Sequence, residues 1–192
     1  MTEREKYAPG PAAGASVDKA VHEDGEKWAL VVVRELRHPP EMVWQALTDP
    51  AQLSEWAPFD ADRNLAAVGP VKLSTVGTPT PQISETTVKR AEEPRLLEYS
   101  WGGGDLRWEL EPLGNGTRLT LWHNIDRRFI SWGAAGWHIC FDVLDRLLAG
   151  EPIGRIVGPE VMKFGGWQRL NTEYAKQFSI ETPGWQPNAP KP

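Results

Sequence analysis

Three successive segments after residue 95 alternate between apolar and polar side chains. In the middle segment, Leu106, Trp108 and Leu110 are separated by charged residues. Such alternation is typical of a β-strand with one buried face and one solvated face. Gly102-Gly103-Gly104 and Gly114-Asn115-Gly116 separate the segments, as expected for hairpin turns. The sequence therefore predicts an antiparallel meander whose apolar face needs a cover.

A helix predicted over Ala134–Leu148 is the expected cover. Its apolar side chains recur at three- and four-residue spacing and form one broad stripe, made of Trp137, Cys140, Phe141, Leu144 and Leu148. Gly150 follows as the glycine that ends the helix. The order of elements predicts an α+β fold. In it, a curved antiparallel sheet of about six or seven strands wraps around a long C-terminal helix, with an extra C-terminal helix beyond.

The remaining elements follow from turn signals and apolar runs. A helix starts at His38-Pro39-Pro40-Glu41, and a second starts at Asp49-Pro50 and ends near Trp56. The first strand is expected to pair with the last. The predicted strands are Trp28–Leu36, Asp62–Val68, Val71–Val76, Ile83–Ala91, Arg95–Trp101, Asp105–Glu111 and Thr117–Asn124.

Four segments are expected along the chain. Residues 1–26 are rich in Ala, Gly, Pro and charge and lack periodicity, which predicts a disordered N-terminal tail that adds little to the core. Residues 27–150 form the folded domain. Residues 151–180 form a helical extension, and residues 181–192 form a proline-rich tail.

Composition excludes several classes of protein. The chain has 21 Lys and Arg against 26 Asp and Glu, with no basic stripe, so no nucleic-acid partner is expected. No apolar run is long enough for membrane insertion or a secretory signal. One cysteine, Cys140, fits a reducing compartment, and we expect a cytoplasmic location. No His or Cys pair has zinc-motif spacing, so neither a metal nor another cofactor is expected.

His123 is the polar residue of greatest interest. It shares a strand face with Leu119 and Leu121 and should point inward near the strand's end. Its imidazole could hydrogen-bond a ligand or transfer protons, or it could be a satisfied histidine at a cavity rim. The neighbouring aromatic residues fit a pocket and ordinary core packing equally well. The predicted ligand-binding residues are Tyr99, Trp101, Trp108, Leu121, His123, Trp137 and Phe141.

One combination of motifs resembles a known superfamily. His38-Pro39-Pro40-Glu41-Met42-Val43-Trp44, then Leu47-Thr48-Asp49-Pro50, Leu53 and Trp56, resembles the N-terminal signature of the START-like (SRPBCC) superfamily. Leu97–Trp101, Gly136-Trp137 and Leu144 resemble its branch related to the activator of the heat-shock chaperone ATPase. The resemblance covers about residues 28–150 and implies a helix-grip fold with an apolar cavity. Two features depart from the pattern: a single tryptophan before Pro58, where the branch often has two, and the extension after residue 150.

The leading functional hypothesis is binding of a small hydrophobic molecule, lipid-like or aromatic, between sheet and helix, without chemistry of its own. A cyclase- or hydrolase-type enzyme that uses His123 with Tyr99 or a glutamate is an alternative. A co-regulator of a heat-shock chaperone ATPase is a third, implied by the family branch alone. Whether the chain forms a homodimer is left open.

Overall fold

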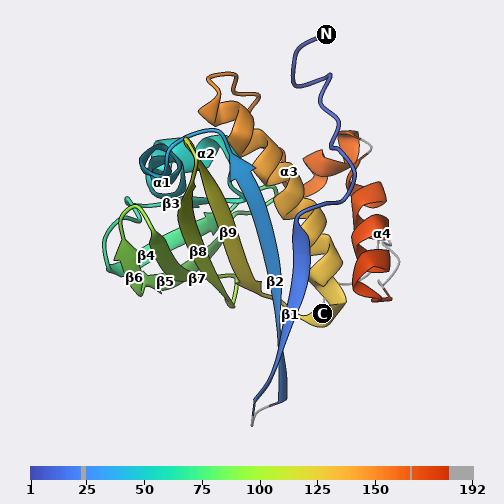
Figure 1. The fold of residues 1–192 in the computed structure, drawn as a ribbon, viewed down its shortest axis with the longest axis horizontal. Helices are drawn as coiled ribbons and strands as arrows, with labels where there is room; N and C mark the ends of the chain where they lie inside the picture. Colours follow the sequence, from blue (N-terminus) through green and yellow to red (C-terminus); the bar gives the residue numbers. More distant parts are fainter. Residues whose placement is uncertain (23–24, 165, 182–192) are drawn as a thin grey trace.

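A six-stranded antiparallel sheet curves around one long helix in the computed structural model of the protein, which describes residues 1–22, 25–164 and 166–181 (Figure 1). The strand order is β1-β2-β9-β8-β7-β6, and a smaller sheet has the order β3-β4-β5. The large sheet contains β1 (Ala15–His22), β2 (Gly25–Leu36), β6 (Arg90–Glu92), β7 (Leu96–Trp101), β8 (Gly104–Leu113) and β9 (Gly116–Asn124). The small sheet contains β3 (Phe59–Ala61), β4 (Gly69–Thr75) and β5 (Gln82–Val88).

The long helix α3 (Ile130–Leu148) crosses the concave face of the large sheet, and α4 (Trp167–Phe178) packs beside it (Figure 1). The short helices α1 (Pro40–Thr48) and α2 (Pro50–Trp56) lie at one end of the sheet, and the 3₁₀ helices are η1 (Arg127–Phe129) and η2 (Gly158–Phe164). This arrangement confirms the predicted helix-grip fold. Among the described residues, no helix is long and apolar enough to cross a membrane.

The register of the central strands follows the predicted alternation. Leu97 and Leu121 both lie opposite Trp108, and all three side chains are buried. Two-residue turns set this register, because Gly102 and Gly103 both have positive φ, which matches the twist of paired strands. As expected, the first strand of the domain, β2, pairs with the last, β9.

Two predicted strands were wrong in detail. Residues 62–68 form a loop after the short β3, because the Arg63 guanidinium donates hydrogen bonds to carbonyl oxygens of Asn64, Ala67, Gly69 and Pro70. These side-chain bonds take the place of a strand ladder. The expected strand Ile83–Ala91 is interrupted at Lys89 and divides into β5 and β6. Helix α3 begins one turn earlier than predicted, because η1, capped by Asp126, leads directly into it.

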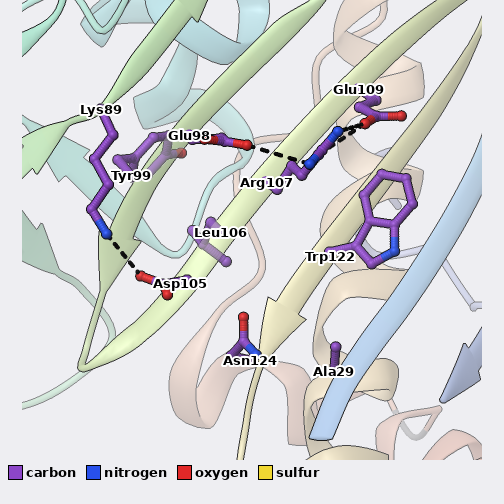
Figure 2. A pocket seen from close by; sticks show the side chains of 10 residues that line it. All are labelled: Ala29, Lys89, Glu98, Tyr99, Asp105, Leu106, Arg107, Glu109, Trp122 and Asn124. Carbon is purple, nitrogen blue, oxygen red and sulfur yellow. Dashed lines mark hydrogen bonds and ion pairs between the residues drawn. The ribbon is translucent and has the colours of Figure 1, made fainter. Parts of the chain in front are cut away.

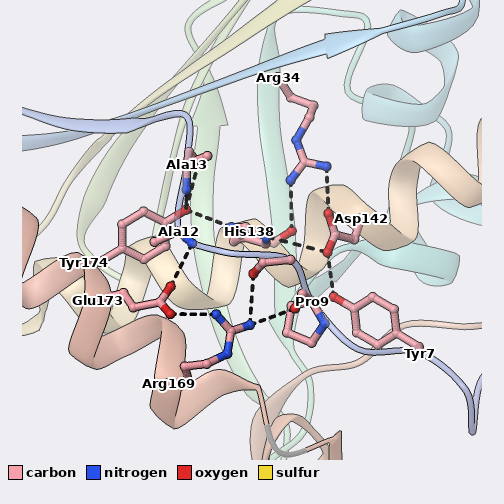
Figure 3. Close-up of polar contacts among 11 residues, drawn as sticks. Tyr7, Pro9, Ala12, Ala13, Arg34, His138, Asp142, Arg169, Glu173 and Tyr174 are labelled. Carbon is pink, nitrogen blue, oxygen red and sulfur yellow. Dashed lines mark hydrogen bonds and ion pairs between the residues drawn. The ribbon is translucent and has the colours of Figure 1, made fainter.

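The N-terminus is structured where the sequence predicts disorder. Residues 15–22 form β1 on the edge of the sheet, and Tyr7 is only 6% exposed. The Tyr7 hydroxyl donates a 2.7 Å hydrogen bond to Asp142 of α3 (Figure 3). Arg4 Nη1 donates to the carbonyl oxygens of residues 153–155 at 2.8–3.1 Å. Hydrogen bonds to groups far away in the sequence hold this segment in place. Such bonds produce no periodic pattern in the sequence, so the pattern of residues did not predict them. Residues 182–192, in the expected proline-rich tail, lie outside the described residues.

Candidate functional site

An apolar cleft of about 600 Å³ lies between the sheet, the first half of α3 and the segment that follows residue 155. None of the described residues that line it is Asp, Glu, Lys or Arg. The lining consists of Pro58, Trp101, His123, Ile125, Phe129, Trp132, Gly133, Gly136, Trp137, Cys140, Ile156, Val157, Gly158, Pro159, Val161, Met162 and Trp167. A mostly apolar concavity of this size with few polar groups suits a small uncharged molecule.

His123 is the most polar side chain of the lining. Its Nδ1 accepts a 3.0 Å hydrogen bond from the indole Nε1–H of Trp137. Because an indole nitrogen can only donate, Nδ1 carries no proton, and the neutral ring carries its proton on Nε2. Burial lowers the pKa of His123 to about 4, so the ring is neutral near pH 7. Among the described residues Nε2 has no hydrogen-bond partner, so it remains an available donor.

Gly104 makes room for this histidine. A Cβ atom on Gly104 would lie 3.2 Å from Nε2 of His123 and 2.3 Å from the carbonyl oxygen of Asn124. The sequence predicted only a turn for Gly102-Gly103-Gly104, so this second role of Gly104 was missed. A glycine that follows a tight turn and faces the strand of His123 was the available signal.

Two predicted tryptophans lie in the lining and are held in place by hydrogen bonds. Trp101 Nε1 donates to Thr75 Oγ1 at 2.8 Å, and its ring centroid lies 5.8 Å from that of His123. Trp137 meets Trp101 edge-on, with centroids 5.9 Å apart. The structure thus brings Trp101, His123 and Trp137 together in the lining of the cleft.

The other four predicted ligand-binding residues do not line the cleft. Tyr99, Trp108, Leu121 and Phe141 are each at most 2% exposed and belong to the core. Trp108 Nε1 donates to the Tyr99 hydroxyl at 3.2 Å, and the Trp108 ring packs against Trp56 and Phe141. These side chains form the part of the core that lies next to the cleft.

The C-terminal extension supplies one wall of the cleft, a role that the sequence did not predict. Ile156, Val157, Val161, Met162 and Trp167 all lie beyond the predicted domain end at residue 150. Arg155 anchors this wall through bonds of 2.6 and 3.2 Å to the two carboxylate oxygens of Asp60. Gly158 packs backbone to backbone against Gly77, since a Cβ on Gly158 would lie 2.3 Å from the Gly77 carbonyl oxygen.

The surroundings of His123 bear on whether it could take part in acid–base or nucleophilic chemistry. No titratable side chain in the described ranges hydrogen-bonds to its ring, and the Tyr99 hydroxyl is engaged by Trp108. Burial raises the pKa of Tyr99, which keeps it protonated. Burial likewise raises the pKa of Cys140 to about 12, which disfavours the nucleophilic thiolate.

A second hollow, of about 540 Å³, lies on the outer face of the sheet (Figure 2). Its charged side chains already pair with each other. Lys89 lies 3.5 Å from Asp105, and Arg107 pairs with Glu109 and lies 3.6 Å from Glu98. Because these charges already neutralise each other and are exposed to solvent, they would contribute little free energy to the binding of a ligand. We therefore take the apolar cleft as the candidate site.

His138 and Asp142 lie one turn apart on α3, with Nε2 of His138 3.7 Å from Oδ2 of Asp142. They belong to a polar cluster that joins the N-terminal segment to α3 and α4 (Figure 3). Arg34 donates to Asp142 at 2.7 Å, and His138 Nδ1 lies 2.7 Å from the Tyr174 hydroxyl. None of these residues lines the apolar cleft, and their contacts join the N-terminal segment, β2, α3 and α4.

Comparison with solved structures supports the fold. CalU16 from Micromonospora echinospora is similar, with a TM-score of 0.62 and 21% identity for its crystal structure, over 84% of this chain and 95% of that chain. Protein EF2215 from Enterococcus faecalis, of unknown function, has a TM-score of 0.63 at 14% identity, over 84% and 90% of the two chains. Protein MLL2253 from Mesorhizobium loti has a TM-score of 0.57 at 26% identity, over 65% and 99%.

Sequence comparison places the chain in a family. No curated protein matches the sequence. Residues 37–149, more than half of the chain, match the family model described as activator of Hsp90 ATPase homolog 1-like protein. This segment spans α1 to α3 and ends just before the extension that completes the cleft. The chain therefore belongs to the family of activator of Hsp90 ATPase homolog 1-like proteins.

Proposed function

We propose that the protein binds a small, uncharged, hydrophobic molecule in the apolar cleft. The observation that carries this proposal is a lining without charged side chains in which two donors, Nε2–H of His123 and the indole N–H of Trp132, have no partner in the described chain. Apolar surface supplies affinity for such a ligand, and a few placed polar groups supply its orientation.

Electrostatics favours an uncharged ligand. A charged group moved into a mostly apolar cleft loses its hydration, which costs several kcal/mol unless an opposite charge meets it. The lining offers no opposite charge, and His123 is neutral because burial lowers its pKa to about 4. A fatty acid would therefore bind only with its carboxylate outside the cleft.

Binding without chemistry is the function that this geometry supports best. The enzyme alternative required a second titratable group within hydrogen-bond reach of His123. In the described part of the chain, the ring of His123 bonds instead to the indole of Trp137. An indole N–H neither takes up nor releases a proton in the accessible pH range, so this pair positions the imidazole and does not relay protons.

Native mass spectrometry of freshly purified protein tests the proposal. We expect a mass above that of the chain, removed by mild organic extraction, and saturable binding of the uncharged dye Nile red by the extracted protein. If no compound copurifies and Nile red shows no saturable binding, the proposal is wrong. The heat-shock-chaperone co-regulator hypothesis would then take its place.

A further inference from the structure

The floor of the cleft is a face of α3 on which small residues replace larger side chains. Gly133, Gly136 and Cys140 follow at three- and four-residue spacing, so they share one face, and all three line the cleft. A glycine inside a helix destabilises it by about 0.5–1 kcal/mol relative to alanine. Each of the two glycines therefore calls for a physical reason.

The two glycines have different reasons. A Cβ on Gly133 would lie 3.1 Å from Cδ1 of Ile125 and 3.4 Å from Cδ2 of Leu30, so close packing of α3 on the sheet accounts for it. A Cβ on Gly136 would meet no atom within 4 Å. Packing within the protein therefore does not require glycine at position 136. The absence of a side chain at position 136 leaves space free in the cleft.

The walls around this floor include flat aromatic rings, and hydrogen bonds hold two of them. Trp137 is fixed by its hydrogen bond to His123, and Trp101 by its bond to Thr75. Trp132 packs edge-on against Trp167, with ring centroids 5.7 Å apart. The indole N–H of Trp132 is buried without a hydrogen-bond partner in the described chain, so it is a second donor in the lining. Aromatic walls of this kind favour a ring that stacks or packs edge-on against them.

We infer that the cleft takes a flat, uncharged ring compound with a hydrogen-bond acceptor directed at Nε2–H of His123, and that Gly136 determines the size of ring system it admits. This inference rests on the proposed function and adds the class of ligand and a specificity-determining residue. A side chain at position 136 would extend into the space that the ring occupies, and its Cβ would meet no atom of the protein within 4 Å.

A set of ketones tests the inference, because each carries the same acceptor. Aryl methyl ketones with one, two and three fused rings, and a linear methyl ketone of the same carbon number as the two-ring compound, would compete with Nile red. We expect the two- and three-ring ketones to bind the parent at least tenfold more tightly than the linear one. Gly136→Leu should weaken them at least tenfold and change the one-ring ketone less than threefold. Gly136→Ala should weaken the three-ring compound most.

Asp145→Leu, at an exposed position of the same helix, is the matched control and should leave every affinity unchanged. Gly136→Ala keeps the test decisive if the leucine variant does not fold. Equal affinities in the parent and both Gly136 variants, or a linear ketone that binds as tightly as the two-ring ketone, would overturn this inference and leave the proposed function standing. If neither Nile red nor any ketone binds the parent, the proposed function itself is wrong.

Discussion

The indole N–H of Trp137 donates a 3.0 Å hydrogen bond to Nδ1 of His123. This bond joins α3 to β9 at the cleft, and it determines which imidazole nitrogen carries the proton. Through it, a helix residue positions a donor that a bound ligand would meet. The relationship also ties the protonation of His123 to the stability of the fold.

Stability should therefore depend on pH through His123. Burial lowers its folded pKa to about 4, whereas an unfolded histidine titrates near about 6.5. Between these values the unfolded chain binds a proton that the folded chain does not, so the free energy of unfolding falls as the pH falls. From pH 7 to pH 4.5 we expect His123 to account for a loss of about 2–3 kcal/mol.

Urea unfolding of the parent and of His123→Gln at these two pH values measures that contribution. The glutamine variant should lose less stability on acidification, by about the same 2–3 kcal/mol. His138, whose pKa burial also lowers, is present in both proteins and cancels in the comparison. An equal loss in the two proteins would show that His123 titrates normally.

Gly158→Ala should displace the wall that the extension forms. Its Cβ would lie 2.3 Å from the Gly77 carbonyl oxygen, and its φ of +58° is strained for any side chain. We expect a loss of more than about 2 kcal/mol of stability together with weaker Nile red binding. Gly114→Ala is the control, because Gly114 has φ +59° and open space around its Cβ position. It should destabilise by about 1–2 kcal/mol and bind Nile red as the parent does. If Gly158→Ala binds the dye as the parent does, the extension does not form part of the binding site.

Strand alternation was enough to predict the central sheet and part of the site. Parity placed His123 and Trp108 on the inward face, and helical spacing placed Trp137 toward them. Parity could not separate the aromatic residues that line the cleft from those beneath it. Trp101 and Tyr99 share a face of β7, yet only Trp101 reaches the cleft, whereas the ring of Tyr99 is buried in the core against Phe59.

The parts that escaped prediction depend on contacts between distant positions. Gly77 and Gly158 pack together although 80 residues separate them, and single-sequence patterns report only local periodicity. Tyr7 lies in a segment without sequence periodicity, yet its hydroxyl donates a hydrogen bond to Asp142 on α3. Side-chain hydrogen bonds to single partners leave no repeating signal in the sequence.

The N-terminal segment should therefore add to stability. Tyr7→Phe removes the 2.7 Å bond to Asp142 and should destabilise by about 1.5–3 kcal/mol, the range for hydrogen bonds to charged groups. Burial and the Asp142 carboxylate raise the pKa of Tyr7, so the hydroxyl remains a donor at neutral pH. Lys6→Ala removes only an exposed ion pair with Glu3 and should change the free energy of unfolding by less than about 1 kcal/mol. Equal effects of the two substitutions in thermal or urea unfolding would argue against docking of this segment.

Cys140 should react slowly in the folded protein. Burial raises its pKa to about 12, so at pH 8 the thiolate fraction is very small. Iodoacetamide should label the urea-unfolded chain with one equivalent and leave the folded chain largely unmodified, as read by intact-mass spectrometry. Rapid labelling of the folded protein would instead identify an activated thiol and favour an enzyme.

The most direct test of ligand binding is a ¹H–¹⁵N NMR titration of the indole N–H groups with the two-ring aryl ketone. We predict saturable shifts for Trp101, Trp132, Trp137 and Trp167, all in the lining of the cleft. The indoles of Trp44 and Trp56, buried outside that lining, should move little, as should Trp122 at the outer hollow. The absence of saturable shifts, or shifts confined to Trp122, would contradict the account.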